Sequence, residues 1–209
     1  KQKTAYEMNT WVMANVESVS AATAETEPPR LLYPLLGGFA VGGETFIHEI
    51  IVASGAENVA SGEFDGYEVL NDEVVLTLDP EVLLVTDQTA GQIMNTEPYS
   101  LTTAGENNRS VTLEVNYINQ AGPRSIVYSM RNLTAQLHPG QYDESDHITR
   151  QAVADGEYTP ANSEDSTERD DGNDARIDRD TETAIPVFGF AVVLAAIVFI
   201  GGGLMLRRR

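Results

Sequence analysis

The chain has 209 residues and a formal net charge of −19 at pH 7, and its lysines are confined to Lys1 and Lys3. Such a surface repels nucleic acids and anionic lipids, and the lack of cysteine excludes disulfides, thiolate metal sites and a cysteine nucleophile. Because acidic residues spread through residues 44–87 as well as the tail, the composition favours a high-salt environment, in which salt screens dense carboxylates.

Residues 1–24 carry apolar side chains at helical spacing, which predicts a helix that ends before Glu27-Pro28-Pro29. The first residue is Lys1, and no charged-then-apolar leader stands before this helix. We therefore expect the sequence to be the C-terminal part of a longer protein, with residues 1–29 forming a helical segment ahead of the folded lobe.

The first half of the lobe is expected to contain a strand, a glycine-rich loop and a helix. Residues 30–36 form a short apolar strand, residues 37–43 a glycine-rich loop, and residues 44–54 a helix that Gly55 ends. Residues 58–60 add a strand fragment, and residues 63–68 are expected to be loop.

The second half of the lobe repeats the alternation of helices and strands. A short helix is expected from residue 71 to 79, a fully buried strand at 82–86, an alternating strand at 110–117 and a helix at 122–137. This order predicts an α/β fold with a parallel sheet flanked by helices, in one lobe that spans residues 30–142.

The glycine-rich loop GGFAVGGET lacks the sequence features of common catalytic or nucleotide sites. It has neither the Gly-Lys-Ser/Thr of a P-loop nor G-x-G-x-x-G spacing, and Glu44 would repel a phosphate. The three histidines, His48, His138 and His147, are far apart in sequence and form no H-E-x-x-H motif, and G-x-S-x-G is also absent. We therefore expect no metal site and no enzymatic activity.

The position of the glycines leaves two interpretations open. A loop at the carboxyl end of a parallel strand is where α/β sheets bind ligands, and glycine lets the backbone approach a ligand closely. The alternative is a tight strand-to-helix turn, in which Glu44 and Thr45 cap the following helix. Residue spacing does not decide between them.

The C-terminal third predicts a tethered protein. Residues 143–183 are acidic, polar and poor in large apolar side chains, which is typical of a disordered stalk. Residues 184–206 form an uncharged apolar run long enough to cross a bilayer, and residues 207–209 are all arginine. The positive-inside rule then predicts a single-pass cell-membrane protein with its C-terminus cytoplasmic and its folded domain extracellular.

A resemblance to a sorting signal and two glycosylation sequons also fit this membrane topology. The stalk and apolar run resemble the archaeal surface-sorting signals named for a Pro-Gly-Phe tripeptide, although residues 186–190 read PVFGF and lack that tripeptide. Retention as a transmembrane helix is therefore expected. The sequons at Asn108 and Asn132 are candidate glycosylation sites on an extracellular domain.

The folded region resembles the C-terminal lobe of the vitamin B12 and iron-siderophore class of ABC-importer substrate-binding proteins. The resemblance is carried by LLYPLLGGFAVGGETFIHEIIVASGAENVA at residues 31–60, by GYEVLNDEVVLTLDPEVLLVT at residues 66–86, and by the helix that begins at Gly122-Pro123-Arg124. It implies a class III periplasmic-binding-protein lobe, chelatase-like in fold, whose N-terminal partner lobe is missing from this sequence.

The resemblance also implies a function and a set of site residues. The protein would capture a cobalt or iron chelate (cobalamin, a ferric siderophore or haem) and deliver it to an ABC permease, with no cofactor of its own. Glu73 would dock onto the permease. The implied ligand contacts are Gly38, Phe39, Gly42, Gly43 and Tyr67. A stalked surface-structural or adhesion domain without a transport role is the alternative hypothesis.

Overall fold

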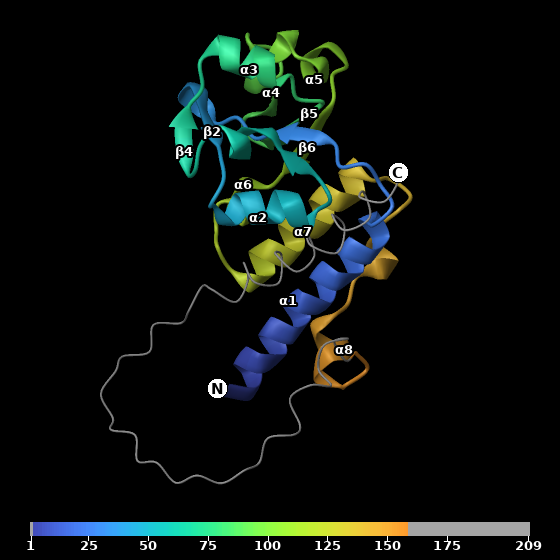
Figure 1. Ribbon diagram of the computed structural model, residues 1–209. Helices are drawn as coiled ribbons and strands as arrows, with labels where there is room; N and C mark the ends of the chain where they lie inside the picture. The colour runs from blue at the N-terminus through green and yellow to red at the C-terminus, as the bar shows by residue number, and fades with distance from the viewer. Residues whose placement is uncertain (1, 159–209) are drawn as a thin grey trace, which may run out of the picture. The chain divides into compact units, whose positions relative to one another are not determined.

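The computed structural model describes residues 2–158, which form an α/β fold around one parallel sheet (Figure 1). The strands are β1 (Arg30–Leu32), β3 (Glu57–Asn58), β5 (Val82–Thr86) and β6 (Ser110–Leu113), in the spatial order β3-β1-β5-β6. The chain first adds β3 on one side of β1 and then β5 and β6 on the other. The strand order therefore reverses between β1 and β5, and ligands of open α/β sheets bind at the carboxyl ends of the strands at such a point.

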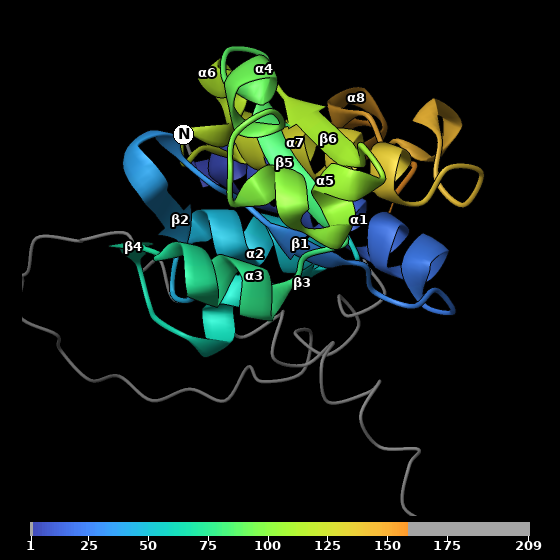
Figure 2. The same cartoon turned by 90° about the horizontal axis from the view of Figure 1, so that it is seen from above.

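Helices cover both faces of this sheet (Figures 1 and 2). One face is covered by α1 (Gln2–Thr23), α2 (Phe46–Ala53) and α7 (Pro123–Leu137). The other face is covered by α3 (Asp72–Leu78), α4 (Ala90–Ile93) and α5 (Thr103–Glu106). The predicted layered architecture is thus confirmed for the residues that the structure describes.

The core lies on both sides of β5, the strand predicted to be fully buried. All five of its residues are buried, and alternate side chains point to opposite faces of the sheet. On the face covered by α3, α4 and α5, Leu83 and Val85 pack in a cluster with Leu32, Val75, Leu78 and Tyr99. Burial of this apolar surface is the main force that holds the layers together.

Side-chain caps fix where the helices begin. The Thr45 hydroxyl accepts a hydrogen bond from the His48 amide at 2.9 Å, and the Asn71 side chain accepts one from the Val74 amide at 2.9 Å. The helix predicted from residue 44 starts instead at Phe46, because Glu44 has a left-handed φ of 51° that cannot continue a helix. Thr45 is therefore the cap, and Glu44 lies outside the helix.

The strand predicted at residues 110–117 is half helix. Strand β6 ends at Leu113, which pairs with Thr86, the last residue of β5. Beyond Thr86 the sheet offers no further strand to pair with, and the chain turns into α6 (Val115–Ile118), whose first amide donates to the Asp87 carboxylate at 3.1 Å. The alternating sequence pattern does not indicate that the strand ends at Leu113, because that end is set by the length of β5.

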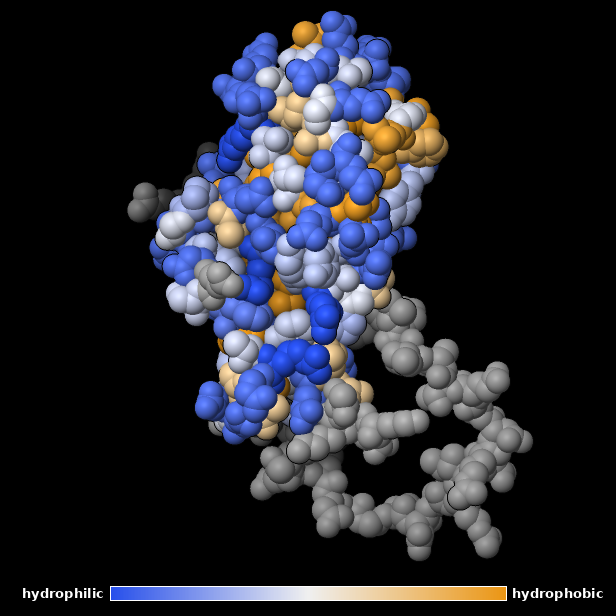
Figure 3. Space-filling model, turned by 180° about the vertical axis from the view of Figure 1, so that it is seen from behind, coloured by the Kyte–Doolittle hydropathy of each residue, from blue (hydrophilic) through white to orange (hydrophobic). Residues whose placement is uncertain are grey.

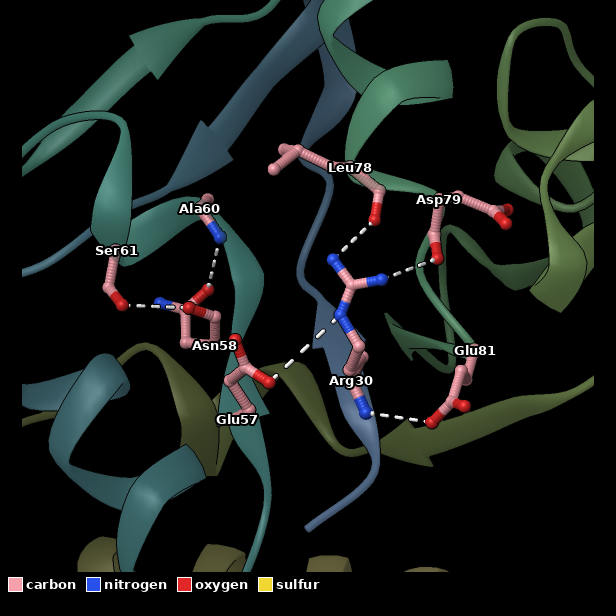
Figure 4. Close-up of polar contacts among 8 residues, drawn as sticks. All are labelled: Arg30, Glu57, Asn58, Ala60, Ser61, Leu78, Asp79 and Glu81. Atoms are coloured by element: carbon pink, nitrogen blue, oxygen red, sulfur yellow. Dashed lines mark hydrogen bonds and ion pairs between the residues drawn. The ribbon is translucent and has the colours of Figure 1, made fainter.

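Arg30 joins the amino ends of three strands (Figure 4). Its guanidinium donates to the Leu78 carbonyl at 2.7 Å, its amide donates to Glu81 at 3.1 Å, and its Nε lies 4.0 Å from Glu57. Nearby, the Asp79 carboxylate accepts hydrogen bonds from the backbone amide and hydroxyl of Thr103, and these hold the pKa of Asp79 below its usual value.

A wide hollow of about 520 Å³ opens at the same end of the sheet. Glu27, Arg109, Arg30 and its two acidic partners line it. Because Arg30 already binds these partners, the hollow is a structural junction. The opposite, carboxyl end of the strands is where a ligand site is expected.

Residues 143–158 contain regular structure, which differs from the disordered stalk predicted to begin at residue 143. Residues 143–158, here called the strap, contain η4 (Glu144–Asp146) and α8 (Arg150–Ala154) and run along α1 (Figure 1). The Trp11 indole donates to the Ile148 carbonyl at 2.8 Å, and the buried Asn15 amide donates to the same oxygen at 3.0 Å. The segment is polar, as its composition indicates. Its backbone can nevertheless hold a fixed conformation, because side chains of α1 form hydrogen bonds with its backbone groups.

Asn15 is expected to be the main polar attachment of the strap. Its side-chain oxygen accepts hydrogen bonds from the His147 ring at 2.7 Å and the Ile148 amide at 3.3 Å, in addition to the bond that it donates to Ile148. Asn15→Ala should lower the free energy of unfolding by about 1.5 kcal/mol, because the half-buried Ile148 amide and the His147 ring lose their acceptor, while Trp11 still donates to the Ile148 carbonyl.

The strap of this variant should also open more often, so trypsin should cut after Arg150 roughly tenfold faster than in the unchanged protein. Asn9→Ala, at an exposed position of the same helix, is the matched control. Equal cleavage rates in the two variants would show that Asn15 does not hold the strap. The measurement is limited proteolysis with cleavage sites assigned by mass spectrometry.

The predicted membrane anchor cannot be placed in this structure. No helix within residues 2–158 is both long enough and apolar enough to cross a bilayer. The rest of the predicted stalk, the apolar run at 184–206 and the arginines at 207–209 lie outside the described residues.

Candidate functional site: an apolar face at the carboxyl end of the sheet

A small antiparallel ribbon extends the carboxyl end of β1. It consists of β2 (Phe39–Val41) and β4 (Tyr67–Val69), segments that the sequence analysis placed in loops. The chain leaves β1, makes one turn of 3-10 helix, η1 (Leu36–Gly38), and folds back so that the Leu35 amide donates to the Phe39 carbonyl at 2.7 Å. The turn requires glycine, since Gly37 and Gly38 have φ values of 80° and 82°.

The ribbon and its turn expose four large apolar side chains. Phe39 pairs with Val69 and Val41 with Tyr67, so all four side chains of these pairs point to one side of the ribbon. Of these, Phe39, Tyr67 and Val69 are 44%, 48% and 59% exposed, and Leu36 in the turn is 51% exposed. We call Leu36, Phe39, Tyr67 and Val69 the apolar face.

Figure 3 shows hydrophobic side chains gathered at the upper right edge of the molecule, where β2 and β4 lie when seen from behind. A contiguous group of exposed apolar side chains on a polar surface marks a site of interaction. Its place, at the carboxyl end of β1 beside the reversal of strand order, is the place expected for a ligand.

A buried tyrosine, Tyr33, lies near Tyr67. Tyr33 is 1% exposed, and burial together with the nearby Tyr67 phenol raises its pKa to about 12. Burial also raises the pKa of Tyr67. Both phenols are therefore neutral at physiological pH, and the face presents a flat, uncharged aromatic surface.

A small hollow lies beside the apolar face and shares Leu36 with it. It has a volume of about 160 Å³ and is bordered by the glycine turn, the start of α3 and the end of α4. Its polar side chains are Asp72, Gln92, Thr96 and Glu97. In the part of the chain that the structure describes, neither Asp72 nor Glu97 makes a side-chain hydrogen bond or ion pair, so both carboxylates remain open as acceptors.

Gly42 and Gly43 do not lie on the exposed surface. Both are buried, and they form backbone hydrogen bonds with the chain at residues 64–66, including Gly43 N to Phe64 O at 2.9 Å. A Cβ atom on Gly42 would lie 2.3 Å from the Phe64 carbonyl oxygen. The predicted close approach is therefore real, but its partner is the chain itself, and Gly42 and Gly43 act as supports of the ribbon.

His48 has a structural environment rather than a metal-binding one. Its Nδ1 lies 3.3 Å from the side-chain nitrogen of the buried Asn58, which also donates to the Val41 carbonyl at 3.1 Å. Asn58 thus fastens β2 to α2, a role that the sequence analysis did not assign. Within residues 2–158, no group of three or more histidine or acidic side chains is arranged to hold a metal ion.

The remaining predicted residues fall into different settings. Glu73 is exposed in the first turn of α3, where the helix dipole favours a carboxylate. Asn108 lies in an exposed turn with a left-handed φ of 51°. Asn132 lies in the middle of α7 and donates to the Tyr128 carbonyl at 2.9 Å, while Thr134 of the same sequon is fully buried. Of the two sequons, the one at Asn108 is the accessible one.

Sequence reasoning identified two members of the apolar face and missed two. Phe39 and Tyr67 were predicted ligand contacts, and the structure brings them onto one surface with Leu36 and Val69. Leu36 was predicted to belong to a short apolar strand, and Val69 received no role. The pairing of residues 39–41 with 67–69 would have revealed both, but short strands far apart in sequence carry no local signal of their pairing.

Comparisons with known proteins find similar binding proteins. No protein-family model matches the sequence. A cobalamin-binding protein of Halobacterium salinarum, recorded in two strains, is 32% identical over 136 residues, and the match covers 59% of this chain and 36% of that protein. The chain thus spans about a third of the length of the curated relative that it matches.

Solved structures agree on the fold. The periplasmic haem-binding protein RhuT of Roseiflexus sp. RS-1, in apo form, aligns with a TM-score of 0.54 and 24% identity, over 66% of this chain and 56% of its own. The molybdate-binding protein MolA of a Haemophilus influenzae ABC transporter aligns with a TM-score of 0.59 and 19% identity, over 65% and 44%. The chain therefore has an α/β fold similar to that of periplasmic binding proteins.

Proposed function

We propose that this chain forms one lobe of the substrate-binding protein of an ABC importer, and that the apolar face is the wall that it offers to a metal chelate. The observation that carries the proposal is the exposed group Leu36, Phe39, Tyr67 and Val69 at the carboxyl end of β1. The names of the relatives support a transport role, since one binds cobalamin and another binds haem. Cobalamin, a ferric siderophore and haem are the candidate cargoes.

The proposal includes a permease as partner and a second lobe as the other wall of the cleft. Glu73 is exposed in the first turn of α3, where a basic group of the permease could reach it. A face of this size covers only part of a large chelate, and the rest of the contacts would come from a second lobe. In this proposal the domain stands outside the cell, held at the membrane by residues 184–206.

The test is a calorimetric titration of the complete protein with cyanocobalamin, a ferric hydroxamate and haem in molar salt. Saturable one-to-one binding of one chelate is expected. Calorimetry is preferred to tryptophan fluorescence, because Trp11, the single tryptophan, is buried beneath the strap on α1 and does not belong to the apolar face. A folded protein that binds none of the three would favour a surface-structural or adhesion domain.

A further inference from the structure

Strand β4 leaves one edge of the ribbon open. The ribbon has two strands, and among the residues that the structure describes no strand pairs with β4 on the side away from β2. All residues of β4 are exposed, and the strand lies at the left edge of the described lobe in Figure 1. An open strand edge presents backbone donors and acceptors with which another extended chain can pair.

The register of the ribbon shows where its backbone hydrogen bonds lie. The Leu70 amide donates to the Gly38 carbonyl at 3.0 Å, and the Gly42 amide donates to the Gly66 carbonyl at 2.9 Å. In an antiparallel ribbon, hydrogen-bonded pairs alternate with non-hydrogen-bonded pairs. Glu68 lies two residues from each of these pairs, so it belongs to the hydrogen-bonded pair between them, and its backbone groups face β2.

The backbone groups of Tyr67 and Val69 therefore face away from β2. On β2, an outward group of this kind is used within the lobe, since the Phe39 carbonyl accepts a hydrogen bond from the Leu35 amide at 2.7 Å. On β4, the N–H and C=O groups of Tyr67 and Val69 have no hydrogen-bond partner within residues 2–158. Each of these two residues thus offers one donor and one acceptor to an added strand.

The side chains around this edge determine which strand would fit. Glu68 is exposed, and in the part of the chain that the structure describes its carboxylate has no hydrogen bond or ion pair. Exposed acidic residues flank β4 in the sequence on both sides: Glu63, Asp65, Asp72 and Glu73. No lysine or arginine occurs between Arg30 and Arg109. An added strand that carries a basic residue would therefore complement this edge, whereas an acidic strand would be repelled.

A second copy of the same chain fits this edge less well. If β4 paired with its own copy in antiparallel orientation about the centre of the strand, the two Glu68 carboxylates would lie opposite each other. Like charges in that position destabilise a strand pair, and a charged residue on an exposed edge opposes pairing between copies. The charge of the edge therefore favours a different polypeptide.

We propose that the outer edge of β4 binds an extended segment of another protein, in which a basic residue stands between two apolar residues. The apolar residues would exchange backbone hydrogen bonds with Tyr67 and Val69 and place their side chains next to these two. The basic residue would lie opposite Glu68 in a non-hydrogen-bonded pair, where side chains approach most closely. The added strand would widen the apolar face without covering it, so this inference does not depend on chelate binding.

The test uses end-blocked peptides with Val-Arg-Val at the centre and threonines on either side. One control peptide has glutamate in place of the arginine. Another carries N-methyl groups on both valines, which removes the donors to the Tyr67 and Val69 carbonyls. Calorimetric titration of the complete protein, in the lowest salt in which it stays folded, should show the arginine peptide binding about fivefold more tightly than the glutamate peptide. The N-methylated peptide should not bind.

A charge reversal on the protein identifies the position of the peptide. Glu68→Lys should reverse the preference between the arginine and glutamate peptides. Glu106→Lys, an equal change of charge at an exposed position of α5 outside the ribbon, should leave the preference as it is. Binding of the arginine peptide should also slow hydrogen exchange at the Tyr67 and Val69 amides, because both become donors in the new strand pair.

Several results would overturn the inference. Equal binding of the N-methylated peptide, an unchanged preference in Glu68→Lys, or unchanged exchange at the Tyr67 and Val69 amides would mean that the edge of β4 does not hold the peptide. A folded protein that binds none of the peptides has the same meaning, as does a dimer that protects these two amides in the absence of peptide. None of these results bears on the proposed function, which the chelate titration tests by itself.

Discussion

Replacing Gly42 by alanine is expected to lower the free energy of unfolding by about 3 kcal/mol, through overpacking and loss of hydrogen bonds. The new Cβ would lie 2.3 Å from the Phe64 carbonyl oxygen and 2.5 Å from Cδ2 of the same residue. The backbone at residues 64–66 must then move away, which breaks the hydrogen bond from the Gly42 amide to the Gly66 carbonyl. The segment that moves leads directly into β4, so the apolar face should be disturbed as well.

The matched control for this change is Gly62→Ala. Gly62 is exposed, its φ is not left-handed, and no atom lies within 4 Å of the position that its Cβ would occupy. The control should change the free energy of unfolding by less than about 0.5 kcal/mol. The measurement is urea unfolding followed by circular dichroism. If the two variants unfold at the same urea concentration, the close approach of Gly42 to Phe64 is wrong.

The environment of Gly42 also shows what the sequence can and cannot predict at this site. Two glycines before a helix left two interpretations open, the close approach of a ligand or a tight turn into a capped helix, and the structure shows Thr45 capping the helix and Phe64 of the same chain close to Gly42. The sequence does not say what comes close, because Phe64 is far along the chain and nothing in GGET identifies it. The same limit hid the ribbon, whose two strands are short and pair across the intervening α2 and β3.

Elements with strong local signals were predicted closely. Strand β5 is a continuous apolar run bounded by Pro80 and Asp87, and α7 begins at Pro123 and ends before His138-Pro139, so both have signals at each end. The strap is the opposite case. Its order depends on hydrogen bonds from Trp11 and Asn15 to Ile148, and these residues are more than a hundred positions away. Composition alone therefore predicted disorder.

Two residues of the apolar face, Phe39 and Tyr67, were named from the sequence, but its extent was not predicted. An aromatic residue on a loop near a glycine turn indicated Tyr67, and the resemblance to chelate-binding proteins gave it a role. Whether a residue such as Val69 is exposed depends on which side of a ribbon it occupies, and this is set by its pairing with Phe39. The open carboxylates of the hollow could not be predicted at all, since acidic residues are frequent throughout the sequence.

Tyr67→Ala is expected to weaken chelate binding roughly 30-fold, which corresponds to about 2 kcal/mol. Tyr67 is the largest side chain of the apolar face, and its ring offers a flat, half-exposed surface with few rotatable bonds. Strand β4 pairs with β2 through the backbone, so the truncation should leave the ribbon in place. Affinity should be measured by calorimetry with whichever chelate the unchanged protein binds.

Two companion variants make the result specific to the apolar face. Tyr6→Ala removes an equally large and even more exposed tyrosine, 67% exposed, from α1, and should leave affinity unchanged. Tyr67→Phe keeps the ring and should retain most of the affinity, because the contact is made by the aromatic surface and not by the phenol. If Tyr67→Ala binds as tightly as Tyr6→Ala, the chelate does not lie on this face, and the wall of the cleft must be sought elsewhere on the lobe.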